Sequence, residues 1–288
     1  MSLLLASFGF GLVTAAVLAI AAVGFTLQFA VTDVLNLAYG AVMILSAYVA
    51  YAINQAGISI WVGVVAAAVA GAIVSLGLNR GVYTPFKRRG TSPIALVIVA
   101  LGMTLILEFG LQALVGADNV SYRLNQGPGI DLGGLRLSAT QLVILALAVV
   151  IMVAVHLLLS RSRLGKAMRA TAANPSLARN SGIRTDRVVT LTWAISGALC
   201  GIAGGVFAID AGSFGATSTD LFLVLILAAV FVGGPGKAYG AMIGAVLIGL
   251  STEMGAAYVT PAYKDVIAFV LLLGMLAVRP TGLLGERT

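Results

Sequence analysis

Long apolar segments with almost no charged residues make up most of this 288-residue chain. The first six of these segments each have about twenty residues or more, which is the length that a helix needs to cross the hydrocarbon core of a bilayer. The segments lack the apolar–polar alternation of transmembrane β-strands. Nine segments are expected, at 8–31, 34–56, 58–79, 93–116, 139–159, 188–210, 218–234, 238–258 and 264–278.

The sequence therefore predicts an all-α fold: a polytopic integral membrane helix bundle with about eight or nine membrane segments. The whole chain, residues 1–288, is expected to form a single transmembrane domain. Since the seventh and ninth segments are short, one or two helices are expected to be broken or re-entrant.

The composition excludes soluble proteins and argues against an enzyme. Hydrophobic residues make up 60% of the chain and charged residues 9%, against about a quarter charged in a soluble domain. One histidine and one cysteine are present, and no HExxH, CxxC, GxSxG or nucleotide-binding P-loop motif occurs. We therefore expect no catalytic residue, no metal and no cofactor, and no ATP hydrolysis by this chain alone.

Lysine and arginine are distributed unevenly between the two sets of loops. Fourteen of the 17 follow the third, fifth, seventh or ninth segment, and the other three are Arg123, Arg136 and Lys264. Loops rich in these residues stay in the cytoplasm. The asymmetry predicts an N-terminus outside and a C-terminus in the cytoplasm.

The loop at 161–187 carries seven basic residues and one acidic residue, Asp186. Its sequence predicts a short helix, a break at Asn174-Pro175, a second short helix and a stop at Gly182-Ile183. A simple connector needs less order than this, so we interpret the loop as a docking platform for a cytoplasmic partner. The residues predicted to make this coupling contact are Arg163, Leu164, Gly165, Lys166, Arg169, Asn174, Ala178, Gly182 and Ile183.

Polar residues inside the apolar segments are candidates for a translocation path, because an ionised group at the bilayer centre is costly. Thr104, Glu108 and Gln112 recur every four residues and share one face of the fourth segment. They either line a path or clamp neighbouring helices together. Glu253, toward the outer end of the eighth segment, is a weaker candidate because it can reach interfacial water.

Two breaks interrupt the apolar pattern. Gln28, Asn36 and Tyr39 belong to the first, which is either a loose turn at the interface or a discontinuous helix whose freed backbone groups line a path. The second is the Gly-Gly-Pro-Gly-Lys sequence at 233–237, where a helix cannot continue.

Small residues recur every four positions in three segments, which predicts close helix contacts. They are Gly63, Ala67, Gly71 and Ser75 in the third segment, Gly197, Gly201 and Gly205 in the sixth, and Gly240 and Gly244 in the eighth.

Motifs in order along almost the whole chain resemble one family. They are Asn-Leu-Ala-Tyr-Gly at 36–40, Val-Tyr-Thr-Pro at 82–85, Leu-Gly-Lys-Ala-Met-Arg-Ala at 164–170, Gly-Ile-Arg-Thr-Asp-Arg at 182–187, Val-Phe-Val-Gly-Gly-Pro-Gly at 230–236, Gly-Ala-Met-Ile-Gly at 240–244, Tyr-Lys-Asp at 263–265 and Arg-Pro-Thr-Gly-Leu-Leu-Gly at 279–285. With these motifs the chain resembles the shorter of the two paired permease subunits of bacterial ATP-binding-cassette importers of the branched-chain amino acid type. Tyr39 departs from the pattern, because the family usually has histidine there.

The resemblance implies a permease in the bacterial plasma membrane, paired with a second homologous permease, two cytoplasmic ATPase subunits that bind the ATP, and an extracytoplasmic solute-binding protein. It also implies that 161–187 is the coupling region. Relatives of this type carry branched-chain and other amino acids, amides, urea and small organic acids. The alternative is a secondary transporter or channel that works without an ATPase, although the charges within the membrane segments are few for ion coupling.

Overall fold

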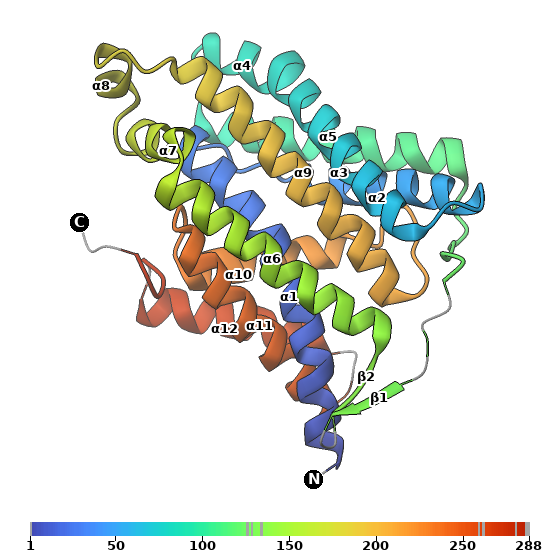
Figure 1. The fold of residues 1–288 in the computed structure, drawn as a ribbon. Coiled ribbons are helices and arrows are strands. Elements are labelled where there is room, and N and C mark those ends of the chain that lie inside the picture. The colour runs from blue at the N-terminus through green and yellow to red at the C-terminus, as the bar shows by residue number, and fades with distance from the viewer. Residues whose placement is uncertain are drawn as a thin grey trace.

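The computed structural model describes residues 2–124, 127, 129–132, 135–258, 260, 263–279 and 281–285 (Figure 1). In chain order the elements are α1 (Ser2–Thr32), α2 (Tyr39–Gln55), α3 (Ile60–Leu78), the π-helical turn η1 (Asn79–Tyr83), α4 (Thr84–Arg88), α5 (Pro93–Val115), β1 (Gly129–Leu132), β2 (Leu135–Ser138), α6 (Ala139–Arg161), α7 (Arg163–Ala173), α8 (Pro175–Asn180), α9 (Thr185–Ala211), α10 (Asp220–Gly233), α11 (Ala238–Tyr258) and α12 (Lys264–Val278).

Six helices in the described part of the chain are long and apolar enough to cross a membrane: α1, α3 with its continuation to Arg88, α5, α6, α9 and α11. Two of these helices, α5 and α6, expose many large apolar side chains, as a surface that faces lipid or another membrane protein does. The prediction of a polytopic helical membrane protein is therefore confirmed. The antiparallel hairpin β1–β2, which pairs Gly129 with Ser138, was not expected from the sequence.

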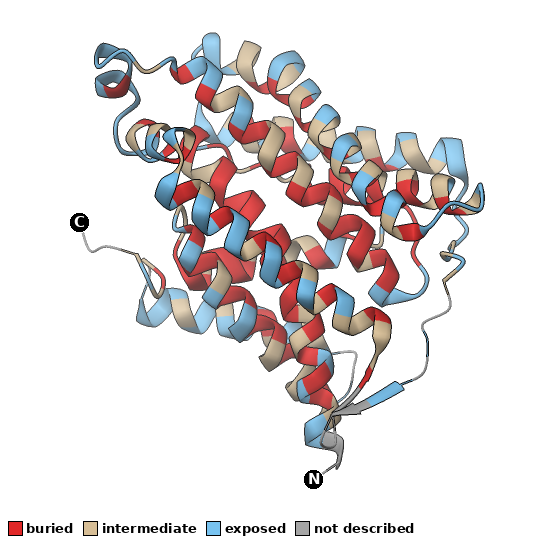
Figure 2. Cartoon of the chain, viewed as in Figure 1, coloured by how far each residue is buried: buried red, intermediate tan, exposed pale blue. Residues whose placement is uncertain are grey.

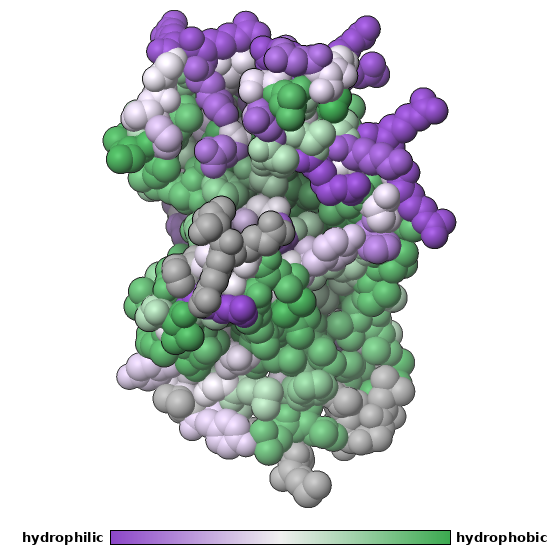
Figure 3. Space-filling model, turned by 90° about the vertical axis from the view of Figure 1, so that its left-hand side faces the viewer, coloured by the Kyte–Doolittle hydropathy of each residue, from purple (hydrophilic) through white to green (hydrophobic). Residues whose placement is uncertain are grey.

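The bundle has two distinct ends. At one end the C-terminus of α1 meets α4, where the Lys87 ammonium donates to the Thr32 carbonyl, and the segment after α12 pairs with the end of α10 through Leu283 N–H and Val232 O at 2.9 Å. The helices α7 and α8 extend from this same end (Figure 1). We call it the basic face, and Figure 3 shows hydrophilic side chains gathered there above a hydrophobic flank.

The opposite end is the hairpin face. Here the start of α1 contacts β2, and the turn after α2 holds the chain that follows α5, because Asn54 Oδ1 accepts a hydrogen bond from Arg123 N–H at 2.6 Å. The loops predicted to carry most lysines and arginines lie at the basic face, although Arg287 is outside the described residues. The N-terminal helix thus begins at one face and the C-terminal segment ends at the other.

The core is centred on α1 and α9, whose residues are mostly buried (Figure 2). Close contact between α9 and α3 depends on the predicted small residues: a Cβ added at Gly71 would lie 2.2 Å from Gly197 O, and one added at Gly201 would lie 2.0 Å from Ala67 O. A Cβ added at Gly244 would lie 2.0 Å from Ala229 O, so α11 meets α10 in the same way. The predicted close contacts are confirmed.

The two short helices α2 and α10 both begin inside the bundle. Residues 33–38 are non-helical, so the first predicted break is real, and Asp33 has a positive φ of 52°. The Thr219 hydroxyl, at the N-terminal end of α10, donates to Gly40 O in the first turn of α2 at 2.9 Å. At 14 residues, α10 is about 21 Å long, shorter than the roughly 30 Å hydrocarbon core. The helix ends at Gly233, which agrees with the second predicted break.

The packing of α3 on α9 gives a prediction with a control on the same helix. Gly71→Ala places its methyl group against the α9 backbone, whereas Gly77→Ala meets nothing within 4 Å. We expect Gly71→Ala to lower the free energy of unfolding by about 1–3 kcal/mol through overpacking. Gly77→Ala should be neutral or slightly stabilising, because alanine is the better helix former. The thermal midpoints of the two purified variants in detergent measure the difference, and equal midpoints would contradict the contact.

Candidate functional site

The segment at the basic face has the predicted order of helix, break, helix and stop. Ser162 begins α7 and accepts a hydrogen bond from Gly165 N–H at 2.8 Å, and Asn174 begins α8 by accepting from Leu177 N–H at 3.0 Å. Gly182 has a φ of +84°, and Ile183 N–H donates back to Ala178 O at 3.0 Å, which ends α8. These are local cap interactions, so the short sequence specifies them by itself.

Some predicted coupling residues hold this element to the bundle. A Cβ at Gly165 would lie 2.1 Å from Leu158 O, so α7 lies directly on the end of α6. The Arg169 guanidinium donates to the Leu159 carbonyl, and Ala178 is buried. These three residues therefore position the α7–α8 element.

Other residues of the α7–α8 element face outward. Arg163, Lys166 and Asn174 are exposed, and Leu164 and Ile183 are half-buried. Leu177, which was not among the predicted residues, has 63% of its side-chain area exposed on α8. Leu177 and the basic residue Arg179 are both exposed on α8. In the sequence, Leu177 is recognisable by its position directly after Asn174-Pro175-Ser176, where the second short helix begins.

The first break carries a buried polar network. Asn36 Oδ1 accepts from Tyr83 O–H at 2.7 Å, and Gln28 Oε1 accepts from the Ser196 hydroxyl at 3.2 Å. The Tyr39 hydroxyl lies 3.1 Å from Ala21 O, and Gln28 Nε2 has no hydrogen-bond partner in the described structure. The three residues were predicted to belong to the break, but Gln28 lies in α1 and Tyr39 begins α2, so only Asn36 lies in the break itself. They join α1, α2, η1 and α9, and their part in a path remains a prediction.

The second set of predicted path residues lies apart on α5, which packs against α2. The Thr104 hydroxyl donates to Ala100 O in its own helix at 3.0 Å, and Gln112 is half-buried. Glu108 is 4% exposed and lies beside the carboxyl group of Asp220, the first residue of α10. Glu108 Oε1 has no hydrogen-bond partner in the described structure. The structure therefore places Glu108 where α2 and α10 begin.

None of the six predicted path residues lines either of two cavities formed by the described residues. The larger, about 870 Å³, opens at the basic face between α1, η1, α4, α7, α8 and the start of α9. The basic side chains that line it are Arg80, Lys87, Arg88 and Arg179. Thr171 and Trp193 also line it, and each keeps a buried polar atom without a partner in the described structure.

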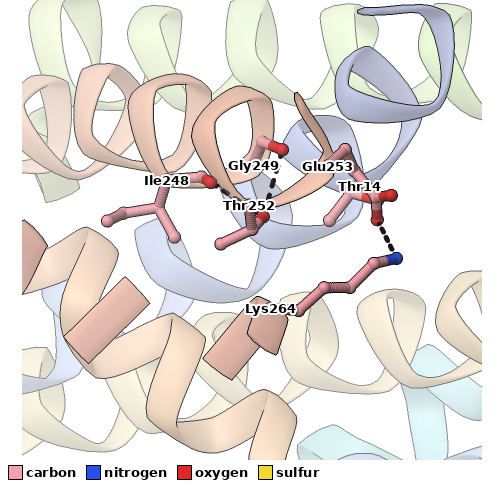
Figure 4. A network of polar contacts seen from close by, with 6 residues as sticks. All are labelled: Thr14, Ile248, Gly249, Thr252, Glu253 and Lys264. Carbon is pink, nitrogen blue, oxygen red and sulfur yellow. Dashed lines mark hydrogen bonds and ion pairs between the residues drawn. The ribbon is translucent and has the colours of Figure 1, made fainter. Parts of the chain in front are cut away.

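The smaller cavity, about 520 Å³, lies toward the hairpin face, and we call it the hairpin-side pocket. Figure 4 shows Lys264 reaching from the start of α12 to Glu253 on α11, beside Thr14 on α1. Lys264 Nζ lies 2.6 Å from Glu253 Oε1, and the Thr14 hydroxyl donates to the same oxygen at 2.9 Å. The lining residues are Phe10, Thr14, Val17, Gln141, Phe207, Asp210, Ala211, Phe222, Leu225, Glu253 and Lys264.

Sequence reasoning missed this pocket, although it noted Glu253. Lys264 was assigned to a loop, and Asp210, the last residue of an apolar segment, was not among the candidate residues. One feature of the sequence does point to this pocket. In the predicted topology, the segment ends that carry Asp210, Glu253 and Lys264 all lie on the same side of the membrane.

Comparison with known proteins agrees with the motifs. The family described as "Branched-chain amino acid transport system / permease component" matches residues 7–276. The chain is 31% identical over 282 residues to the high-affinity branched-chain amino acid transport system permease protein LivH of Escherichia coli (strain K12), covering 93% of this chain and 91% of that protein. It is 29% identical to the corresponding protein BraD of Pseudomonas aeruginosa, covering 96% and 94%.

More distant proteins share the fold or the general activity. The galactofuranose transporter permease protein YtfT of Escherichia coli (strain K12) is 27% identical, covering 92% of this chain and 77% of that protein. The solved structure of PsaBC from Streptococcus pneumoniae in complex with Fab is similar with a TM-score of 0.51 at 13% identity, covering 94% of this chain and 91% of that one. At that identity the likeness concerns the fold alone.

Proposed function

The chain belongs to the family of branched-chain amino acid transport system permease components, and on this premise we propose that it is the membrane-spanning permease subunit of an ATP-driven importer of branched-chain amino acids or related small polar solutes. The family match over residues 7–276 carries the proposal. The helical membrane bundle described above supports it, since an importer subunit must cross the bilayer.

The proposed assembly pairs this chain with a second homologous permease, two cytoplasmic ATPase subunits and an extracytoplasmic solute-binding protein. The sequence has no nucleotide-binding motif, so ATP is assigned to the partner subunits. The α7–α8 element is assigned to the ATPase contact, because it is an ordered platform at the basic face with Leu177 exposed.

The basic face is proposed to be cytoplasmic. Lysine and arginine in short loops hold those loops in the cytoplasm during insertion. With this orientation α1 begins outside, the segment after α12 ends inside, and the hairpin-side pocket lies toward the extracytoplasmic side.

ATP-driven uptake tests the function and the ATPase contact together. Proteoliposomes containing the chain and its partner subunits are expected to accumulate radiolabelled leucine when ATP and the solute-binding protein are present, and not with a non-hydrolysable ATP analogue. Leu177→Asp should reduce both uptake and co-purification of the ATPase subunits by about tenfold or more, since a buried contact residue contributes about 2 kcal/mol.

The control for the coupling variant is Ile58→Asp, which places the same charge on an exposed aliphatic residue at the hairpin face and should retain the ATPase subunits. Uptake driven by an ion gradient without ATPase subunits would favour the secondary transporter. Unchanged ATPase binding in Leu177→Asp would remove that residue from the contact.

The orientation is tested by cysteine labelling. The only cysteine, Cys200, is completely buried and is replaced by alanine. Gly90→Cys and Asn180→Cys should react with a membrane-impermeant maleimide only after permeabilisation, because they are exposed at the basic face. Asp118→Cys, exposed at the other end, should react in intact cells. Reaction of Asn180→Cys in intact cells would reverse the orientation.

We propose further that the translocation route passes Glu108, where α2 and α10 begin. Glu108→Gln keeps the size of the side chain and removes its charge, so a path residue should change the transport rate by about tenfold, or about 1.4 kcal/mol of barrier, while the complex stays assembled. If Glu108 only clamps helices, the thermal midpoint should fall and transport per folded complex should stay the same. Uptake and thermal midpoint are measured on the same preparation.

A further inference from the structure

We propose that the hairpin-side pocket binds the zwitterion of an apolar α-amino acid, with Asp210 holding the ligand's ammonium group. This inference rests on the proposed function, and it assigns the recognition of the solute within the membrane subunit to particular side chains. The pocket brings together groups from six helices, which are α1, α6, α9, α10, α11 and α12. Its volume of about 520 Å³ lies within the range of small-molecule sites, roughly 300–1,000 Å³.

The charges in the pocket are not balanced. Lys264 and Glu253 form an ion pair at 2.6 Å, and the Glu253 side chain is 15% exposed. Asp210 also faces the cavity, within electrostatic range of both members of the pair, and its polar partner is the Gln141 side chain. Two carboxylates against one ammonium leave one negative charge. Asp210 is an exposed residue, so its carboxylate is accessible, and a positively charged ligand group beside it would neutralise the remaining negative charge.

The ion pair also leaves capacity for a carboxylate. An ammonium group has three N–H donors, and Lys264 directs one of them to Glu253. A ligand carboxylate beside Lys264 could accept a second. The pocket thus offers a cationic and an anionic partner within one cavity, which is the complement of a zwitterion. A simple anion would be repelled by the excess carboxylate, and a neutral sugar would leave Asp210 unpaired.

The rest of the lining is apolar. Phe207, Phe222 and Leu225 belong to the wall formed by α9 and α10, and they suit a branched aliphatic side chain. The helix α10 begins at Asp220, next to the buried Thr219, so this wall belongs to the short helix that starts inside the bundle. Binding sites built on helices that start within the membrane are a common solution in transporters.

Direct binding of leucine to the detergent-purified complex, without the solute-binding protein, tests the assignment. Leucinol, which lacks the carboxylate, and 4-methylpentanoate, which lacks the ammonium, serve as competitors. In the wild-type complex both are expected to compete at least about tenfold more weakly than leucine, since each loses one charge-assisted hydrogen bond.

Asp210→Asn keeps the shape of the side chain and removes its charge. It should weaken leucine binding at least about tenfold. Binding of 4-methylpentanoate should not weaken and should become tighter, because that anion has no ammonium group and is no longer repelled by the Asp210 carboxylate. Asp118→Asn is the matched control, the same substitution at an exposed residue outside the pocket, and should bind leucine as the wild type does. Leu225→Phe, which fills the apolar wall, should weaken leucine binding more than alanine binding.

The outcomes separate this inference from the proposed function. If the wild-type complex takes up leucine with ATP but shows no saturable leucine binding, or if Asp210→Asn binds leucine like Asp118→Asn, the pocket assignment is wrong and the import function stands. In that case Glu253 and Lys264 only fasten α12 to α11. If the wild-type complex does not take up amino acids with ATP at all, the proposed function fails.

Discussion

The close approach of backbones around α9 is the constraint on which the rest of the bundle depends. Gly197 and Gly201 meet α3, and a Cβ at Gly204 would lie 2.1 Å from Met43 O in α2. Because lipid tails are as apolar as leucine, the hydrophobic effect does not drive helices together within a bilayer, and close packing of small residues takes its place. With α2 and α3 held this near, Ser196 and Cys200 of α9 reach the break before α2. There Ser196 donates to Gln28, and the Cys200 thiol lies 3.2 Å from Tyr39 O.

That break shows how a discontinuous helix is accommodated. A backbone group without a partner costs several kcal/mol in hydrocarbon, so non-helical chain at membrane depth must be surrounded by protein. Here the side chains of Tyr83, Ser196 and Gln28 enclose the segment before α2, while Thr219 joins the first turn of α2 to the start of α10. Two short helices therefore begin at one place in the bundle. Glu108 lies beside that place, next to Asp220, and is not a member of the hydrogen-bond network at the break.

The sequence predicted the features that depend on nearby residues. The break at Asn174-Pro175 between two short helices, the stop at Gly182 and the four-residue spacing of small residues are all local patterns, and the structure has each of them. Features that depend on distant residues were not predictable. Asp210, Glu253 and Lys264 meet only because the end of α9, the last turns of α11 and the start of α12 lie at the same level of the bundle. The hairpin β1–β2 is local, but its strands are too short to give a clear signal.

Polar residues within the apolar segments therefore fall into two physical groups, and sequence position does not separate them. Asn36 and Tyr39 are nearly inaccessible and bonded within the core, so substituting either removes a partner from a buried neighbour and costs stability first. Asp210 faces a cavity, and among the described residues that line it the one basic side chain, Lys264, is already paired with Glu253. Because Asp210 is exposed, its carboxylate is accessible to a cationic group that enters the cavity. For this reason we assign solute selectivity to the hairpin-side pocket and not to the larger buried network at the break.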